Sequence, residues 1–168
     1  FDTIQNIEMS FADADFTQYR QKFIIPYSFY TLIDEFTLNP YIFHQGRLSQ
    51  EKPLSGETTL EFKEFPKEME KLKGFYTLHS ELATFPSSFK EKRLKECSFR
   101  VTFPQEFIEK IKMLIELGLT GKNQIKLNGK SLKILDITAQ IMDQWLPQQR
   151  IHDEEVVRVD LRGRKNGK

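Results

Sequence analysis

The clearest secondary-structure signal in this chain is the stretch QIKLNGKSLK, residues 124–133. An Asn-Gly pair stands at its centre, between two segments in which apolar and polar residues alternate. Asn-Gly favours a type I′ turn, because both central residues of that turn need a positive φ. We therefore predict a β-hairpin with a two-residue loop, in which Ile125 lies opposite Leu132 on the side facing the core.

Segments with regular periodicity flank this hairpin on both sides. Residues 97–103 alternate like a strand, and Pro104 then opens a helix whose apolar side chains recur at helical spacing as far as Leu119. After the hairpin, the spacing of apolar residues predicts a helix over 136–146. Apolar and charged residues alternate over 157–161, which predicts a final strand.

The N-terminal part of the chain carries a helical pattern. Ser10 and Asp13 resemble a helix-capping box, and apolar residues then recur at helical spacing until Pro26. We therefore predict a helix over 11–24, which the proline ends. The next stretch, 27–36, is rich in aromatic residues and fits either a helix or a strand.

Two strands are predicted in the middle of the chain. Residues 41–56 look like a short strand followed by an exposed loop, and residues 58–65 look like a second strand. Pro66 then marks the first turn of a predicted helix, since proline is tolerated there and glutamate follows it. One stripe of that helix is formed by Phe65, Met69, Leu72, Tyr76 and His79.

Together these segments predict one α+β domain, with about four helices packed on a mixed or mostly antiparallel sheet of four to five strands. A length of 168 residues, with 39% hydrophobic residues and 15 Phe, is enough for one core. We expect the domain to span 1–162 and to be followed by a basic tail at 163–168. A doubly wound parallel fold is not expected, because the sequence lacks regular βαβ spacing and phosphate-binding glycines.

The sequence also bears on the compartment. No apolar run approaches the roughly 20 residues that a membrane-spanning helix needs, and no signal-peptide pattern is present. Cys97 is the only cysteine, so an intramolecular disulfide is excluded. We expect Cys97 to be a small buried strand residue rather than a nucleophile. These features predict a soluble, cytoplasmic protein that does not contact a membrane.

Local motifs predict no catalytic residue, no metal site and no cofactor. The three histidines lie too far apart for metal-ligand spacing, and the chain has no nucleophile elbow or phosphate-binding loop. Asp13 and Asp15 are interpreted as helix-start residues, because carboxylates are favourable there. An active site built from residues distant in sequence stays open, although a binding protein is expected more than an enzyme.

One short motif has a resemblance to a catalytic family. Residues 126–129, Lys-Leu-Asn-Gly, resemble the lysine motif of the ligase-type nucleotidyltransferases, whose lysine takes up the nucleotide. The other signatures of that family are missing from the sequence. The predicted hairpin explains the Asn-Gly pair without any chemistry.

Charge is the remaining functional signal. The net charge is +1, but residues 1–84 contain 8 Lys and Arg against 13 Asp and Glu, whereas residues 85–168 contain 17 against 11. Basic residues of the second half would neutralise phosphates if the fold brought them together. The candidate contacts are Lys90, Lys92, Arg93, Lys95, Lys126, Lys133, Arg158, Arg162, Arg164 and Lys165.

We therefore expect a non-enzymatic binding module that contacts the backbone of DNA or RNA through its basic second half. The alternative is a protein-protein assembly domain, with other subunits or domains as partners. In that alternative, exposed aromatic side chains would form the contact surface, because aromatic residues are enriched at interfaces. The candidates are Tyr27, Phe29, Tyr30 and Tyr41.

Overall fold

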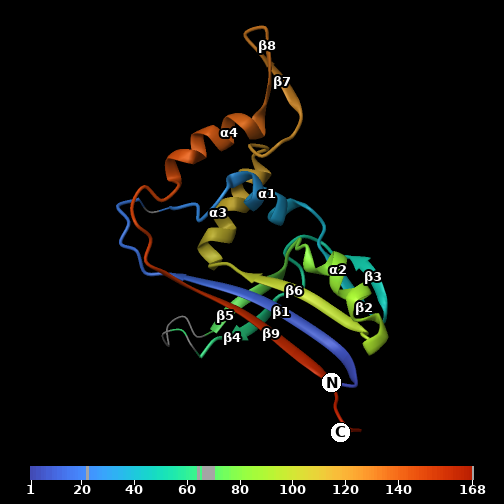
Figure 1. Cartoon of the computed structure of the whole chain (residues 1–168). Helices are drawn as coiled ribbons and strands as arrows, with labels where there is room; N and C mark the ends of the chain where they lie inside the picture. The colour runs from blue at the N-terminus through green and yellow to red at the C-terminus, as the bar shows by residue number, and fades with distance from the viewer. Residues whose placement is uncertain (22, 64, 66–70, 168) are drawn as a thin grey trace.

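The computed structural model describes residues 1–21, 23–63, 65 and 71–167 (Figure 1). The strands of this part of the chain are β1 (Thr3–Asp15), β2 (Tyr41–His44), β3 (Arg47–Gln50), β4 (Thr58–Glu61), β5 (Lys71–Tyr76), β6 (Glu96–Thr102), β7 (Gln124–Leu127), β8 (Lys130–Lys133) and β9 (Asp153–Arg164). The α-helices are α1 (Phe29–Thr37), α2 (Glu81–Ser88), α3 (Gln105–Glu116) and α4 (Ile134–Met142). Two short 3-10 helices, η2 (Lys90–Lys92) and η3 (Asp143–Trp145), follow α2 and α4.

The large sheet is built around two parallel neighbours, β1 and β6. β9 pairs antiparallel with β1 along almost its whole length and ends the sheet on that side. On the other side, β6 pairs first with β2 and then with β5. β3 then pairs with β2, and β4 pairs with β5. In the described residues the sheet is therefore mixed and has seven strands.

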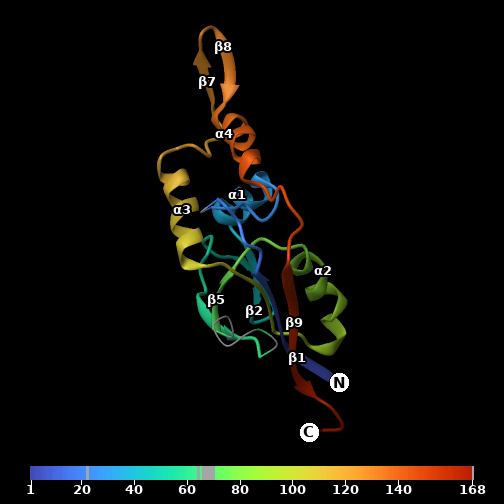
Figure 2. The ribbon, with the colours of Figure 1, turned by 90° about the vertical axis from the view of Figure 1, so that its left-hand side faces the viewer.

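The helices place the main core on one face of this sheet. Figures 1 and 2 show α1, α3 and α4 on the same side of the strands, with α2 beside β2 and β6. Ile7 and Met9 of β1 point into that core, together with Phe99 of β6 and the apolar sides of the helices. No helix of the described ranges is long and apolar enough to cross a bilayer.

A smaller core covers the opposite face at one end of β1. Ala12 and Ala14 are fully buried there, against Leu60 of β4 and the nearby Phe62 and Phe65. Because successive strand residues point to opposite faces, β1 is buried on both sides. Small alanine side chains leave room for the bulky ones that pack on them.

For the described residues, the predicted α+β class with about four helices packed on a mixed or mostly antiparallel sheet is confirmed, and the sheet is mixed. The sheet is larger than the four to five strands expected. The predicted strand at 97–103 and the helix after Pro104 correspond to β6 and α3. The stretch 27–36, which fitted either structure, becomes helix α1. Residues 41–50 form two strands where one strand and a loop were predicted.

The hairpin is confirmed in its register and turn. Asn128 and Gly129 have φ values of 50° and 78°, as a type I′ turn requires. Ile125 lies opposite Leu132. The prediction that this pair faces the core is wrong, because the hairpin stands away from the large sheet and Ile125 is 38% exposed (Figure 1).

The predicted helix over 11–24 is wrong. β1 continues through Asp15, and the described residues from 16 to 28 form no helix. At the end of β1 the Asp15 carboxylate accepts a hydrogen bond from the Thr17 backbone N–H at 2.8 Å. Asp15 thus caps a backbone N–H just after a strand, where the sequence pattern predicted that it would do so at the start of a helix.

The helix predicted to begin at Pro66 is also wrong where the structure describes it. Positions 66–70 lie outside the described residues, but 71–76 form β5, which pairs with both β4 and β6. Pairing on both edges satisfies the backbone groups of β5, and such tertiary contacts override a weak helical spacing. At the end of the chain, β9 continues to Arg164, so the first two residues of the expected tail belong to a strand.

Candidate functional site

The ten basic candidate residues lie in three groups along the chain. Lys90, Lys92, Arg93 and Lys95 lie between α2 and β6; Lys126 and Lys133 lie on the hairpin; Arg158, Arg162, Arg164 and Lys165 lie along β9 and directly after it. The first and last of these groups meet near the N-terminus, where Lys92 donates to the Phe1 carbonyl and the Asp2 N–H donates to the Arg164 carbonyl. In Figures 1 and 2 the hairpin projects from one end of the molecule, whereas α2 and the C-terminus lie toward the other end. The fold therefore does not gather the ten residues into one continuous surface.

The two-stranded hairpin, β7 with β8, is called the ribbon here. Its register places Lys126 opposite Ser131 and Gln124 opposite Lys133, so all four side chains share one face. On that face the Ser131 hydroxyl donates to the Gln124 side-chain oxygen at 2.6 Å. The pairing thus places Lys126 and Lys133 on one face of the ribbon.

The lysines of the ribbon are not neutralised by neighbouring acids. The charged residues in 124–133 are Lys126, Lys130 and Lys133, and none of them takes part in an ion pair with a described carboxylate. Lys122, just before the ribbon, is different, because its ammonium group lies 3.0 Å from the Asp34 carboxylate. The ribbon therefore carries three positive charges away from the body of the protein.

The group on β9 is partly neutralised. Arg158 pairs with Asp160 at 2.8 Å, donates to the Glu61 carbonyl at 2.6 Å and lies 5.1 Å from the centre of the Phe62 ring. Arg158 and Arg162 also line a groove of about 520 Å³, together with the carboxylates of Glu8 and Asp160. Because both signs of charge line the groove, it does not select a polyanion.

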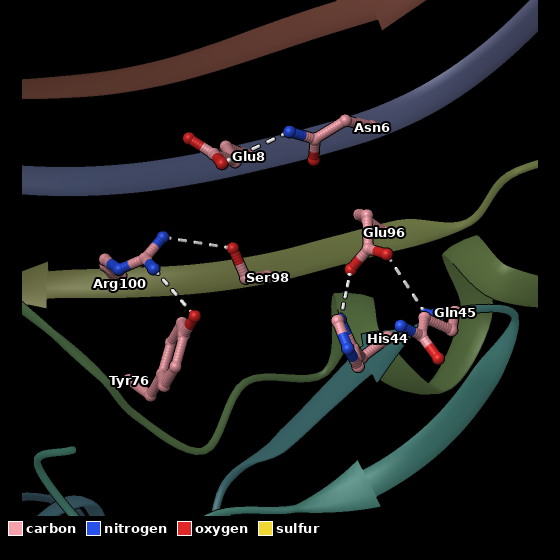
Figure 3. A network of polar contacts seen from close by, with 8 residues as sticks. All are labelled: Asn6, Glu8, His44, Gln45, Tyr76, Glu96, Ser98 and Arg100. Carbon is pink, nitrogen blue, oxygen red and sulfur yellow. Dashed lines mark hydrogen bonds and ion pairs between the residues drawn. The ribbon is translucent and has the colours of Figure 1, made fainter. Parts of the chain in front are cut away.

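A further arginine of this groove, Arg100 of β6, was not among the sequence candidates. Its guanidinium donates to the Ser98 hydroxyl at 3.1 Å and to the Tyr76 hydroxyl at 2.7 Å (Figure 3). It donates to the Gly56 carbonyl as well, at 3.2 Å. It also lies 4.2 Å from the centre of the Tyr76 ring. Neutral acceptors thus fix the position of Arg100. The alternation of β6 could have identified Arg100 from the sequence, because it places this residue on the face opposite to the core residues of the strand.

Polar contacts continue along the same face of the sheet. Glu96 of β6 accepts hydrogen bonds from the backbone N–H of Gln45 at 3.1 Å and lies 2.7 Å from the His44 ring nitrogen (Figure 3). On β1, the Asn6 amide donates to Glu8 at 3.2 Å. These residues satisfy one another and do not form a group that could hold a metal; the described part of the chain contains no such group.

A separate apolar pocket lies at the end of β1, on the side of the main core. Its volume is about 230 Å³, and its walls come from β1, the segment before α1, the end of β6 and the start of α3. Asp13 and Asp15 line it beside aromatic side chains such as Tyr27 and Phe107. One carboxylate oxygen of Asp13 is buried without a hydrogen-bond partner.

Burial, together with the smaller effects of the neighbouring carboxylates of Asp153, Glu155 and Asp15, raises the pKa of Asp13 to about 6. The pKa of Asp15 is instead lowered, because hydrogen bonds from Thr17 and Tyr19 outweigh its burial. Asp13 can therefore exchange a proton near neutral pH. The described residues contain no group that could hold a metal, and the pocket lining by itself does not assign a reaction.

Tyr27 and Glu35 form a partly buried pair beside this pocket. The Tyr27 hydroxyl donates to the Glu35 carboxylate at 2.5 Å. Burial and the nearby Glu35 charge raise the pKa of Tyr27, and burial raises the pKa of Glu35 as well. Tyr27 is thus a neutral, partly buried hydrogen-bond donor that is already engaged by Glu35.

Comparison with known proteins identifies a shared architecture only. No family model matches this sequence, and no curated protein matches it. Among solved structures, the fold is similar to that of apo histidine-tagged saccharopine dehydrogenase (L-Glu forming) from Saccharomyces cerevisiae. The TM-score is 0.50 at 9% identity, over 71% of this chain and 27% of that chain. The chain thus spans about a quarter of the dehydrogenase, and the likeness concerns the fold alone.

Proposed function

We propose that this protein is a non-enzymatic binding module that contacts the phosphate backbone of DNA or RNA through its ribbon. The observation that supports the proposal is the ribbon itself, a two-stranded projection whose charged residues are all lysines. Lys126 and Lys133 share one face of it. The other basic candidates lie elsewhere on the molecule, so the proposed contact is smaller than the basic half of the sequence suggested.

The physical argument is electrostatic and geometric. Each phosphate that a lysine neutralises releases a condensed counterion, and this release drives binding that does not depend on base sequence. A two-stranded β-ribbon also fits the major groove of B-form DNA, which is about 12 Å wide. Lysines that already had carboxylate partners would lose those partners on binding, but the three on the ribbon have no described partner to lose.

Equilibrium binding to a labelled duplex and a labelled single strand tests this proposal. At low salt, the double variant Lys126→Glu with Lys133→Glu should bind about tenfold more weakly or worse, because two phosphate contacts become repulsions. The matched control is Lys90→Glu with Lys95→Glu, which changes the net charge equally between α2 and β6. Equal weakening by both variants, or no binding of the unmodified protein, would contradict contact through the ribbon.

A second candidate function, protein-protein assembly, is favoured by a different observation. The exposed apolar side chains Val157, Val159 and Leu161 form a row along β9, 67%, 50% and 43% exposed. The aromatic surface expected from the sequence does not form as a unit, because Phe29 is buried and Tyr27 pairs with Glu35. Assembly would therefore use β9 rather than the aromatic residues.

A further inference from the structure

Within the part of the chain that the structure describes, β9 has one edge without a partner strand. It is twelve residues long, pairs with β1 on one side and ends the large sheet on the other. Long edge strands of this kind are usually protected by proline, a bulge or a covering element, since their free N–H and C=O groups can pair with another chain. The segment 153–164 contains no proline. Its backbone groups on the free edge are therefore available for strand pairing.

The two faces of β9 have opposite chemical character. The odd-numbered Val157, Val159 and Leu161 continue the apolar face of the sheet, next to Phe11, Met9 and Ile7 of β1. The even-numbered positions on the other face carry, besides the apolar Val156, charges of both signs: Glu154, Arg158, Asp160, Arg162 and Arg164. Acidic residues lie toward the start of the strand and arginines toward its end, so an antiparallel copy of the strand has complementary charge.

Register can be worked out from these charges. A second, antiparallel β9 keeps apolar residues opposite apolar residues only when odd positions face odd positions. With Val159 opposite its own copy, Val157 faces Leu161, Arg158 faces Asp160 and Glu154 faces Arg164. The two neighbouring registers that keep odd positions opposite odd positions move the twofold axis by one residue. One of them places Arg158 opposite its own copy, and the other places Asp160 opposite its own copy. Both shifts set like charges against each other, which destabilises a strand pair.

We propose that this chain forms a symmetric dimer in which the β9 strands of two copies pair antiparallel, with Val159 at the twofold axis, to make one continuous sheet. Apolar side chains then cover one another on one face. Reciprocal pairs of Arg158 with Asp160 and of Glu154 with Arg164 form on the other face. The inference rests on the second candidate function, assembly through β9, and identifies the partner as a second copy.

Sedimentation equilibrium over a range of protein concentrations tests the dimer. The unmodified 19.9 kDa chain should approach twice its mass as concentration rises. Glu154→Arg and Arg164→Glu should each weaken dimerisation about tenfold, because two attractive exposed pairs become repulsive. An equimolar mixture of the two variants should dimerise again, since each copy then offers the charge that the other lacks. Misfolding of either variant cannot produce this recovery.

Disulfide formation tests the register directly. Under mild oxidation Val159→Cys should cross-link two chains, because the paired positions lie about 5 Å apart. Leu161→Cys is the matched control and should not cross-link with itself, since its copy lies about four residues away along the strand. A protein that stays monomeric overturns self-pairing while leaving assembly with a different protein as a separate question. A dimer in which Leu161→Cys cross-links and Val159→Cys does not overturns the register.

Discussion

Asp13 is the residue whose protonation should affect stability most visibly. Its pKa in the folded protein is about 6, against 3.8 for the free side chain, because it is buried near other carboxylates. The folded state therefore holds a proton that the unfolded state has lost between these two values. Stability contributed by Asp13 is fully present below pH 3.8 and is lost as the pH rises through 6.

Asp13→Asn should remove this dependence. At pH 7 the variant should be more stable than the unmodified protein by about 1 kcal/mol, a figure that allows for the partial solvent exposure of the carboxyl group. The difference should vanish well below pH 3.8, where Asp13 is protonated in both the folded and the unfolded state. Urea unfolding at several pH values measures this. A variant that is less stable than the unmodified protein at pH 7 would show that the Asp13 charge is stabilised.

Asp15→Asn is the matched comparison. The pKa of Asp15 is lowered in the folded protein by its hydrogen bonds with Thr17 and Tyr19, so its charge stabilises the fold above the ordinary aspartate pKa. The variant should therefore lose stability at pH 7, opposite in sign to the change at position 13. The same urea series provides this measurement, and equal signs for the two variants would contradict the account.

The roles of single residues were only partly predictable from the sequence. Cys97 was expected to be a buried strand residue and is 1% exposed. Asp13 and Asp15 were interpreted as helix-start residues, yet they line a pocket at the end of a strand. This interpretation was wrong because it depended on the helix predicted over 11–24, which does not form. A carboxylate near polar backbone groups fits the start of a helix and the end of a strand equally well. Pocket walls from four distant segments leave no local trace in the sequence.

The ribbon gives a prediction at the scale of one element. Gly129 has a φ of 78°, and no atom lies within 4 Å of the position that an added Cβ would occupy. Gly129→Ala should therefore strain the turn by about 1 kcal/mol without any clash. Amide exchange in β7 and β8 should speed up, whereas the Tm of the whole protein should change little, because the ribbon stands apart from the large sheet. A large fall in Tm would show that the ribbon supports the core.

Gly74 in β5 should behave in the opposite way. A Cβ at this position would lie 2.5 Å from a methyl carbon of Leu60, inside the pairing of β5 with β4. Gly74→Ala should therefore destabilise the protein by about 1–3 kcal/mol through overpacking. Thermal unfolding measures the loss. An unchanged Tm would mean that Leu60 moves aside without cost.

Elements with a strong local signal were predicted, and elements defined by tertiary contact were not. The Asn-Gly turn and the helix after Pro104 have local causes, so the sequence was sufficient for them. β1 is buried on both faces, which removes the alternation that identifies a strand. β5 was taken for part of a helix, although Gly74 in its centre is unfavourable in a helix interior and was the signal that argued against one.

At the scale of the whole molecule, Cys97 reports on unfolding. The thiol is buried, and burial raises its pKa to about 11. The reactive thiolate is therefore scarce at pH 7, and the native fold also blocks access to it. Labelling by a thiol reagent should be at least about a hundredfold slower than for an unfolded chain and should follow global unfolding in denaturant. Fast labelling of the native protein would indicate local opening around β6.

The overall distribution of charge could not be predicted from the sequence. The basic second half suggested one surface, but the ribbon carries its three lysines to one end of the molecule, away from the loop before β6 and from β9 (Figures 1 and 2). Sequence order does not determine which loops converge, because that depends on the strand order of the sheet. Nucleic-acid contact is therefore proposed for the ribbon alone, because its own turn, and not the strand order of the sheet, brings its lysines together.

The salt dependence of binding to duplex DNA tests the proposed function most directly. Three lysines that each neutralise a phosphate predict that the logarithm of the binding constant falls with the logarithm of salt concentration at a slope of about −3. Lys126→Glu with Lys133→Glu should make this slope shallower by about 2, and Lys90→Glu with Lys95→Glu should leave it unchanged. An equal slope for the unmodified protein and the ribbon variant, or no binding at low salt, would contradict the account.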